Sequence, residues 1–174
     1  MKTRILVRRI GLLLASILVV TALWMVGVEG AYARLLSFST NIVLNVSGGD
    51  TSVAVEKENG DLLFRVITTF EGQRVRFPQK IESLLYPTIM IIAWQLFVAF
   101  TLGIKRSLSG LKWNFPAFFV FQLLFVLLLT AYYSSSLARY TYDLLTDSFY
   151  VIALVIIIID NVRNPQLFIR PERG

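Results

Sequence analysis

The sequence predicts a mainly α-helical integral membrane protein with four transmembrane helices and a small extracytoplasmic β-meander between helices 1 and 2. Three observations lead to this fold class. Hydrophobic residues make up 56% of the 174 residues and charged residues only 16%, whereas soluble domains have roughly 45–50% and about 25%. Four apolar runs divide the chain, and most of the acidic residues lie between the first two.

The first three apolar runs are long enough to cross a bilayer. They cover residues 10–28, 84–104 and 115–133, and a helix needs about 20 residues to cross roughly 30 Å of hydrocarbon. The fourth run, 148–159, is too short by itself, at about 1.5 Å per residue. We extend it backwards to a span over 140–160, because Leu144 and Leu145 continue its apolar character.

Basic residues predict how these spans are oriented. Ten of the 17 Lys and Arg residues lie in the tail 1–9, the loop 105–114 and the tail 161–174, whereas only two of the 11 acidic residues, Glu172 in the last tail and Asp160 at the end of the span before it, lie on that side. Basic residues favour cytoplasmic segments, so we expect a multi-pass protein of the inner or plasma membrane with both termini cytoplasmic and residues 134–139 as an outer loop. Charge divided among three membrane-flanking patches argues against nucleic acid as a partner.

The first apolar run has a second interpretation as a cleaved signal peptide. Basic residues precede it, and Ala31-Tyr32-Ala33 resembles a cleavage site. The run is longer than the usual signal-peptide core, so we favour an uncleaved anchor. Both interpretations place residues 29–83 outside the cytoplasm.

Residues 29–83 read as a helical extension followed by a β-meander of three or four strands. We expect helix over 29–39 and strands over 41–46, 51–57, 62–69 and 74–77, because apolar residues alternate there. Asn59-Gly60 predicts a tight type I′ turn. The apolar face of the meander is a candidate docking surface for a partner, with a cap on the chain's own helices as the alternative; its residues are Val53, Val55, Phe64 and Val66.

Two charged constellations are candidate sites. Arg139, Asp143 and Asp147 are spaced four residues apart, so a helix places them on nearly one face, as a polar site at the outer mouth of the bundle or as an interfacial ion-pair ladder. A second group, formed by Arg74, Arg76 and Lys80, is either a solvated strand face or a contact for anionic lipid or peptide on the outer surface.

Other polar residues point to structure rather than chemistry. Gln95 and Gln122 lie inside predicted spans and are expected to form hydrogen bonds between helices. The chain has no Cys and no His, which removes disulfides, thiolate chemistry and the usual zinc ligands. We therefore assign no catalytic residue, no metal and no cofactor.

The architecture resembles the small four-span membrane proteins associated with exosortases. The stretch Ile81-Glu82-Ser83-Leu84-Leu85-Tyr86-Pro87, which leads into a long apolar helix, is most similar to them. Exosortases use a Cys, an Arg and a His, so this chain cannot be the peptidase itself. The resemblance implies an accessory in membrane-linked processing or export of surface proteins, and it carries no site residue over.

Together these features predict a non-enzymatic accessory or scaffold subunit of a membrane or envelope assembly. Its expected partners are the lipid bilayer and another membrane or envelope protein. The alternative is a small transporter or lipid-handling protein that uses the polar site at the outer end of helix 4. An enzyme acting through Asp143 and Asp147 is the weakest alternative, because two carboxylates on one helix do not flank a reacting atom.

Overall fold

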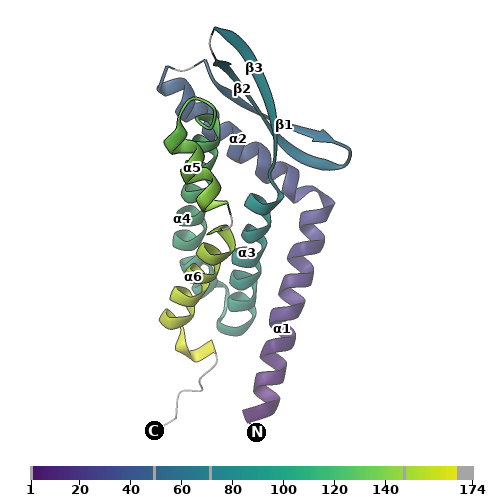
Figure 1. Cartoon of the computed structure of the whole chain (residues 1–174). Helices are drawn as coiled ribbons and strands as arrows, with labels where there is room; N and C mark the ends of the chain where they lie inside the picture. The colour runs from purple at the N-terminus through teal and green to yellow at the C-terminus, as the bar shows by residue number, and fades with distance from the viewer. Residues whose placement is uncertain (1, 49, 71, 147, 168–174) are drawn as a thin grey trace. The chain divides into compact units, whose positions relative to one another are not determined.

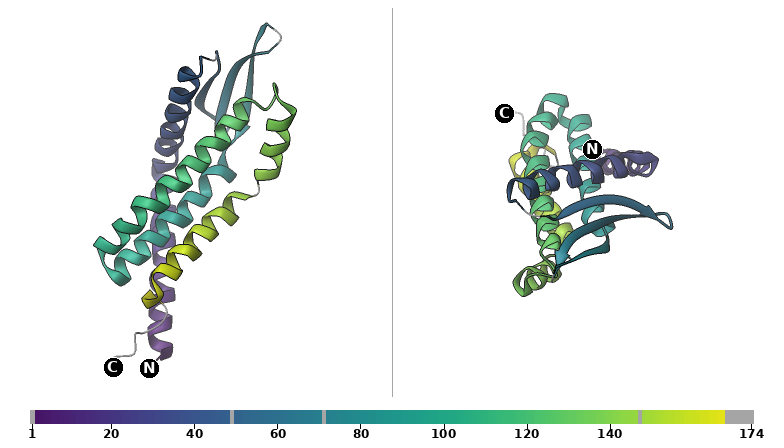
Figure 2. Two further views of the ribbon diagram at one scale, coloured as in Figure 1. Left: turned by 90° about the vertical axis from the view of Figure 1, so that its left-hand side faces the viewer. Right: turned by 90° about the horizontal axis from the view of Figure 1, so that it is seen from above.

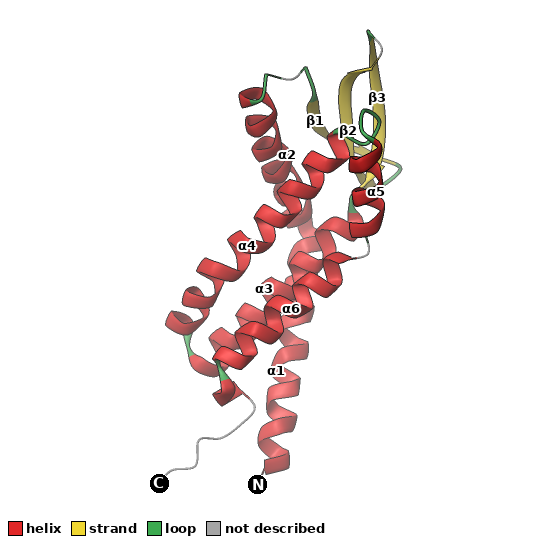
Figure 3. Cartoon of the chain, turned by 60° about the vertical axis from the view of Figure 1, so that its left-hand side comes forward, coloured by secondary structure: helices red, strands yellow, loops and turns green. Residues whose placement is uncertain are grey.

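The computed structural model describes residues 2–48, 50–70, 72–146 and 148–167 (Figure 1). Its helical elements, in chain order, are α1 (Lys2–Leu23), the kink η1 (Trp24–Val28), α2 (Glu29–Val46), α3 (Glu82–Leu102), α4 (Ile104–Thr130), α5 (Ser136–Leu145), α6 (Ser148–Arg163) and the 3-10 turn η2 (Pro165–Leu167). The kink lies at Gly27, whose φ of 130° is not helical. The strands are β1 (Ser52–Glu58), β2 (Asp61–Phe70) and β3 (Gln73–Lys80). The prediction of a mainly helical chain with a small sheet is confirmed (Figure 3).

Three helical segments are long and apolar enough to cross a membrane. They are Leu6–Val46, Glu82–Leu102 and Ile104–Thr130. Helices α5 and α6 meet the same criterion only when they are counted together as one interrupted span. Length and composition therefore support three or four spans.

The chain divides into two compact units. The terminal unit comprises residues 1–26, 87–118 and 150–174, and the sheet unit comprises residues 27–86 and 119–149. Each unit has its own buried contacts, and the two are described in turn.

In the sheet unit, the strands form an antiparallel meander in the order β1-β2-β3. Val53 pairs with Val66, and Val55 pairs with Phe64, so these four residues share one face as predicted. Asn59 and Gly60 connect β1 to β2 with φ angles of 53° and 97°. Positive φ at both central residues is the signature of a type I′ turn, which confirms that prediction.

The strand predicted over 41–46 is wrong, because α2 continues as a helix to Val46. Helix α2 runs along the sheet (Figure 2) and covers the outer edge of β1 at Val53, whereas residues 56–58 of β1 are exposed. The Asn41 amide nitrogen donates to the Val53 carbonyl at 2.8 Å, and the Val53 N–H donates to Asn41 Oδ1 at 2.8 Å. One side chain thus supplies both bonds that a neighbouring strand would make, which protects a sheet edge from pairing with another chain.

Polar contacts also join the helices of this unit. The Tyr32 hydroxyl on α2 donates to Gln122 Oε1 on α4, and Gln122 Nε2 donates to the Leu84 carbonyl at the start of α3. Gln122 is completely buried. The expectation that it forms hydrogen bonds between helices is confirmed.

In the terminal unit, α3 and α4 are joined by a single residue. The segment 105–114 was predicted to be a loop, but it is helical, because the reversal is complete at Gly103. Gly103 has φ of 96°, a conformation that residues with a Cβ rarely adopt. The Ser107 hydroxyl on α4 then donates to the Gln95 carbonyl on α3 at 2.7 Å.

Asp160 near the end of α6 ties α6 to α3. Its Oδ2 accepts from Trp94 Nε1 at 2.7 Å and from Gln95 Nε2 at 3.2 Å. Asp160 is only 4% exposed, so these donors replace water around a buried carboxyl group. The predicted interhelical role of Gln95 is confirmed.

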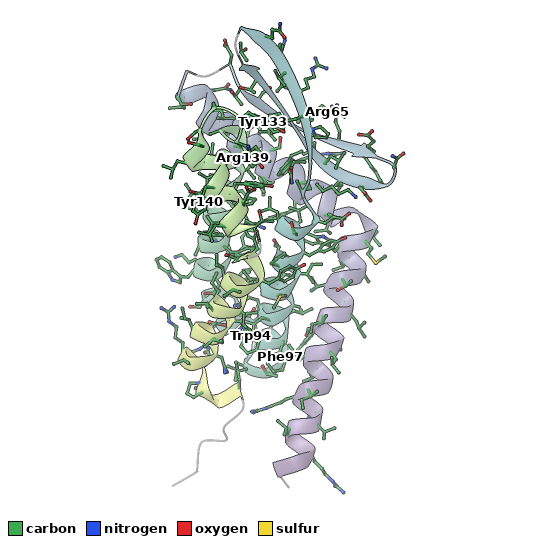
Figure 4. The ribbon with its side chains drawn as sticks, viewed as in Figure 1. Arg65, Trp94, Phe97, Tyr133, Arg139 and Tyr140 are labelled. Atoms are coloured by element: carbon green, nitrogen blue, oxygen red, sulfur yellow. The ribbon has the colours of Figure 1, made fainter. Side chains whose placement is uncertain are left out.

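An apolar cluster lies beside this network. Trp94, Phe97, Val98 and Leu167 are buried together, and the first two rings are 5.5 Å apart (Figure 4). Arg9 on α1 donates to the Leu167 carbonyl. The start of α1 and the end of the described chain are therefore adjacent within this unit.

The predicted outer loop 134–139 contains the start of a helix, and the predicted span 140–160 is interrupted. Helix α5 begins at Ser136, where the Ser135 side chain caps it by accepting from the Ala138 N–H. The regular helix ends at Leu145, and α6 begins at Ser148. The N-cap explains why helix begins before the apolar run does. Residues 140–160 are divided between two helices that together still meet the criterion for one span.

Candidate functional site

The sheet unit contains a pocket of about 380 Å³ that we call the tyrosine pocket. Strand β3, the end of α4 with its following turn, and α5 all contribute to it. Its lining residues are Phe77, Gln79, Leu129, Tyr132, Tyr133, Tyr142, Asp143 and Thr146.

Local structure explains how each element presents its side chains. Phe77 and Gln79 lie two residues apart on β3, so they share the face that the register assigns to Phe64 and Val66. Tyr132 and Tyr133 follow the end of α4 at Thr130, in the turn before the Ser135 cap. Tyr142 and Thr146 are four residues apart and therefore lie on one side of the helical stretch.

Aromatic contacts hold the walls of the tyrosine pocket. Phe77 and Tyr133 meet edge to face with their centroids 4.5 Å apart, which joins β3 to the turn after α4. Tyr142 meets Tyr132 at 5.4 Å and stacks on Phe125 at 4.4 Å. Such pairs contribute about 0.5–1.5 kcal/mol each beyond the area they bury, so the walls are preformed.

The electrostatics of the tyrosine pocket favour a positively charged ligand. The faces of aromatic rings carry partial negative charge, and Asp143 adds a solvent-exposed carboxyl group at the pocket. The chain already uses one ring in this way, since the Arg139 guanidinium carbon lies 5.4 Å from the centroid of Tyr132. Tyr133 and Asp143 in the lining are groups that attract a second cation. The described lining contains one acidic side chain, Asp143.

The structure brings part of the predicted bundle-mouth site to this place. Asp143 lines the tyrosine pocket, and Arg139 lies one turn earlier on α5 against Tyr132. Asp147 lies outside the described residues.

The predicted docking face of the meander is covered by the chain itself. Val53, Phe64 and Val66 are at most 2% exposed, and Val55 is half-buried. Helix α2 contacts the edge of β1 beside this face, where the Ser37 hydroxyl donates to the Val53 carbonyl at 2.6 Å. In this structure, Val53, Phe64 and Val66 form core and present no free surface, whereas Val55 stays partly exposed.

The predicted anionic contact lies on the opposite face of β3. Arg74, Arg76 and Lys80 alternate along the strand and are exposed. Lys80 Nζ lies 2.8 Å from Asp61 Oδ2. This contact raises the pKa of the Lys80 ammonium, chiefly through the hydrogen bond and then through the charge of Asp61.

Sequence reasoning missed Phe77 and Tyr142 as neighbours in one pocket. They lie far apart in the chain, and only the packing of β3 near α5 brings them together. The clustering of Tyr132, Tyr133 and Tyr142 around a short polar stretch was the available signal.

Among the described residues, no group of three or more His, Cys, Asp or Glu side chains could hold a metal ion. Comparisons with protein-family models, with curated proteins and with solved structures find no match for this chain.

Proposed function

We propose that this chain is a multi-pass membrane protein that acts as a non-enzymatic accessory subunit of a membrane or envelope assembly. In this proposal, the tyrosine pocket receives a basic side chain of a partner protein. The observation that carries the proposal is a preformed aromatic pocket with a single exposed carboxyl group, Asp143.

Surface hydrophobicity supports the membrane setting. Large apolar side chains project from α1 and α6, among them Leu18 at 70% exposure and Val151 at 58%. Soluble monomers rarely expose long apolar faces of this kind, and a lipid environment removes the unfavourable contact with water.

Charge and chain connectivity support the proposed topology. The segments with excess basic charge include both ends of the chain, and the contact between Arg9 and Leu167 brings α1 and η2 to one end of the terminal unit. In this proposal α3 spans the membrane, so strand β3 before it and the turn at Gly103 after it lie on opposite sides. We accordingly place both termini in the cytoplasm and the sheet outside.

Cysteine labelling tests this topology, because the natural chain contains no cysteine. We expect Asn59→Cys, in the turn between β1 and β2, to react with an impermeant maleimide added to intact cells. Lys112→Cys on α4 should react only after the membrane is opened. Equal labelling of both variants in intact cells contradicts the proposed topology.

A matched pair of tyrosine variants tests the proposed docking. Tyr133 lines the tyrosine pocket and is 56% exposed, whereas Tyr140 projects outward from α5 and is 69% exposed (Figure 4). We expect Tyr133→Leu to reduce recovery of a stoichiometric partner from native membranes and Tyr140→Leu to leave it intact. Asp143→Asn should act like Tyr133→Leu, with Asp50→Asn as the charge-matched control.

The results for these variants distinguish partner docking from the transporter or lipid-handling alternative. Equal recovery with Tyr133→Leu and Tyr140→Leu rejects docking at the tyrosine pocket. A protein purified without a partner, but with a choline lipid that Tyr133→Leu releases, favours the small transporter or lipid-handling alternative, since aromatic cages also bind quaternary ammonium groups. The architectural resemblance to exosortase-associated proteins supports surface-protein processing as the setting of the assembly.

A further inference from the structure

A second pocket, of about 220 Å³, lies wholly in the terminal unit. Helix α4 contributes Arg106, Trp113 and Asn114 to its lining, and the end of α6 contributes Asp160, Arg163 and Asn164. We call it the arginine pocket. It is separate from the tyrosine pocket, because the two share no residue.

The arginine pocket contains a donor that the described residues leave unused. Asn114 is only 7% exposed, and its Nδ2 has no hydrogen-bond partner among them. A buried amide N–H without a partner is unfavourable, so such groups in native proteins usually meet a ligand or an ordered water. An acceptor oxygen of a ligand would satisfy it.

The acidic group in the arginine pocket is already engaged. Asp160 Oδ2 accepts from Trp94 and Gln95, and the Asn164 amide lies 3.4 Å from Oδ1. Its charge is therefore offset by donors from within the protein. These contacts make Asp160 a structural acceptor rather than a site for a cation.

The described lining of the arginine pocket has two basic side chains, of which Arg106 is held in place by hydrogen bonds. Arg106 Nε donates to Asn164 Oδ1 at 2.6 Å, and its Nη2 donates to the Arg163 carbonyl at 3.3 Å. The Arg163 side chain is exposed at the same pocket. Two guanidinium groups beside an unused amide donor match an anion with several acceptor oxygens, and arginine binds phosphate through parallel hydrogen bonds.

The volume of the arginine pocket and the residues around it restrict the class of ligand further. Pockets for drug-sized molecules have about 300–1,000 Å³, so the arginine pocket suits a head group rather than a whole lipid. Trp113 borders it and is 68% exposed. Exposed tryptophans are typical of the head-group layer of a membrane, where phosphodiesters are abundant.

From these observations we propose that the arginine pocket binds the phosphate group of an anionic molecule. Two sources offer this chemistry, an anionic phospholipid head group and free inorganic phosphate. The pocket is independent of the proposed docking function, so either proposal can fail without the other.

Binding titrations of the purified full chain in mild detergent test the proposal. Native mass spectrometry follows added phosphatidylglycerol, and a parallel titration uses inorganic phosphate. The variants are Asn114→Leu, which removes the unused donor, and Arg163→Gln, which removes an exposed guanidinium. Lys112→Gln is the control, because it removes the same charge from α4 outside the lining.

We expect saturable binding that is about tenfold weaker in Asn114→Leu and in Arg163→Gln, the effect of losing one charge-assisted hydrogen bond. Lys112→Gln should stay within about twofold of the natural chain. Saturation by phosphatidylglycerol alone identifies a lipid source, and the same variant pattern with inorganic phosphate identifies a free anion.

Two results would overturn the proposal. One is equal weakening in Lys112→Gln, which indicates diffuse attraction by surface charge. The other is unchanged binding in Arg163→Gln. Thermal unfolding controls for misfolding, and Arg163→Gln keeps the test valid if Asn114→Leu fails to fold, because Arg163 is exposed.

Discussion

Replacement of Asp160 by leucine should destabilise the protein through two donors that lose their acceptor. Trp94 Nε1 and Gln95 Nε2 both donate to Asp160 Oδ2 inside the terminal unit. Hydrogen bonds to charged groups contribute about 1.5–3 kcal/mol each, whereas interhelical bonds in membranes average about 0.6 kcal/mol with a maximum near 1.7. For two bonds, the lower end of the first range and the upper end of the second both give about 3 kcal/mol. We therefore expect Asp160→Leu to lose about 3 kcal/mol of unfolding free energy.

Equilibrium unfolding in mixed micelles, followed by tryptophan fluorescence, measures this loss. Asp160→Asn keeps one carbonyl acceptor and gives up the charge, so it should lose only about 1 kcal/mol. Asp143→Asn alters an exposed carboxyl group and should stay within about 0.5 kcal/mol of the natural chain. An Asp160→Leu protein as stable as the natural one refutes the reasoning, since both donors would then be satisfied without the carboxyl group.

Three further predictions concern the fold. Phe64→Ala should lose about 3–5 kcal/mol of unfolding free energy because Phe64 is fully buried, whereas Val55→Ala on the same face should lose less than about 1 kcal/mol; similar losses for both would contradict the covered face. Gly103→Ala should lose about 1–2 kcal/mol in the micelle assay, because a Cβ is strained at φ of 96°, and a neutral result would exclude the one-residue turn. The raised pKa of Lys80 means that its bond to Asp61 stabilises the sheet below the ordinary pKa of 10.5 and that this contribution is lost as the pH rises through the raised pKa; NMR titration should show Asp61→Asn returning the Lys80 pKa towards 10.5, and an unchanged pKa would remove Asp61 as the cause.

Sequence reasoning succeeded where the physical signal is local. Apolar runs of about 20 residues predict long helices by their composition alone, and Asn59-Gly60 predicts its own turn because both residues tolerate positive φ. The pairing of Val53 with Val66 followed from simple alternation along the strands.

Sequence reasoning failed where a contact between distant residues determines the local structure. Alternation over 41–46 is typical of a strand, but α2 continues through it and buries Leu44 while Ile42 and Val46 stay exposed. The bonds between Asn41 and Val53 that accompany the helix cross from α2 to β1. Charged residues after Gly103 resembled a loop, although Lys and Arg are good helix formers and α4 begins directly after the glycine.

Prediction of the site residues failed for the same reason, because segments that are distant in the sequence form each pocket. Asp143 was identified from its spacing to Arg139, but the aromatic walls beside it come from β3 and from the turn after α4. The arginine pocket was hidden for a similar reason, because Arg106 and Arg163 belong to segments that the sequence assigned only to topology.

Photo-crosslinking in native membranes tests the central claim most directly. A photoreactive phenylalanine analogue at Tyr133, inside the tyrosine pocket, is compared with the same analogue at Tyr140, outside it. Peptide mapping should find crosslinks from position 133 to one partner segment that contains Lys or Arg, and none to that segment from position 140. Crosslinks to the same segment from both positions, or from position 133 to lipid alone, would contradict docking of a basic side chain in the tyrosine pocket.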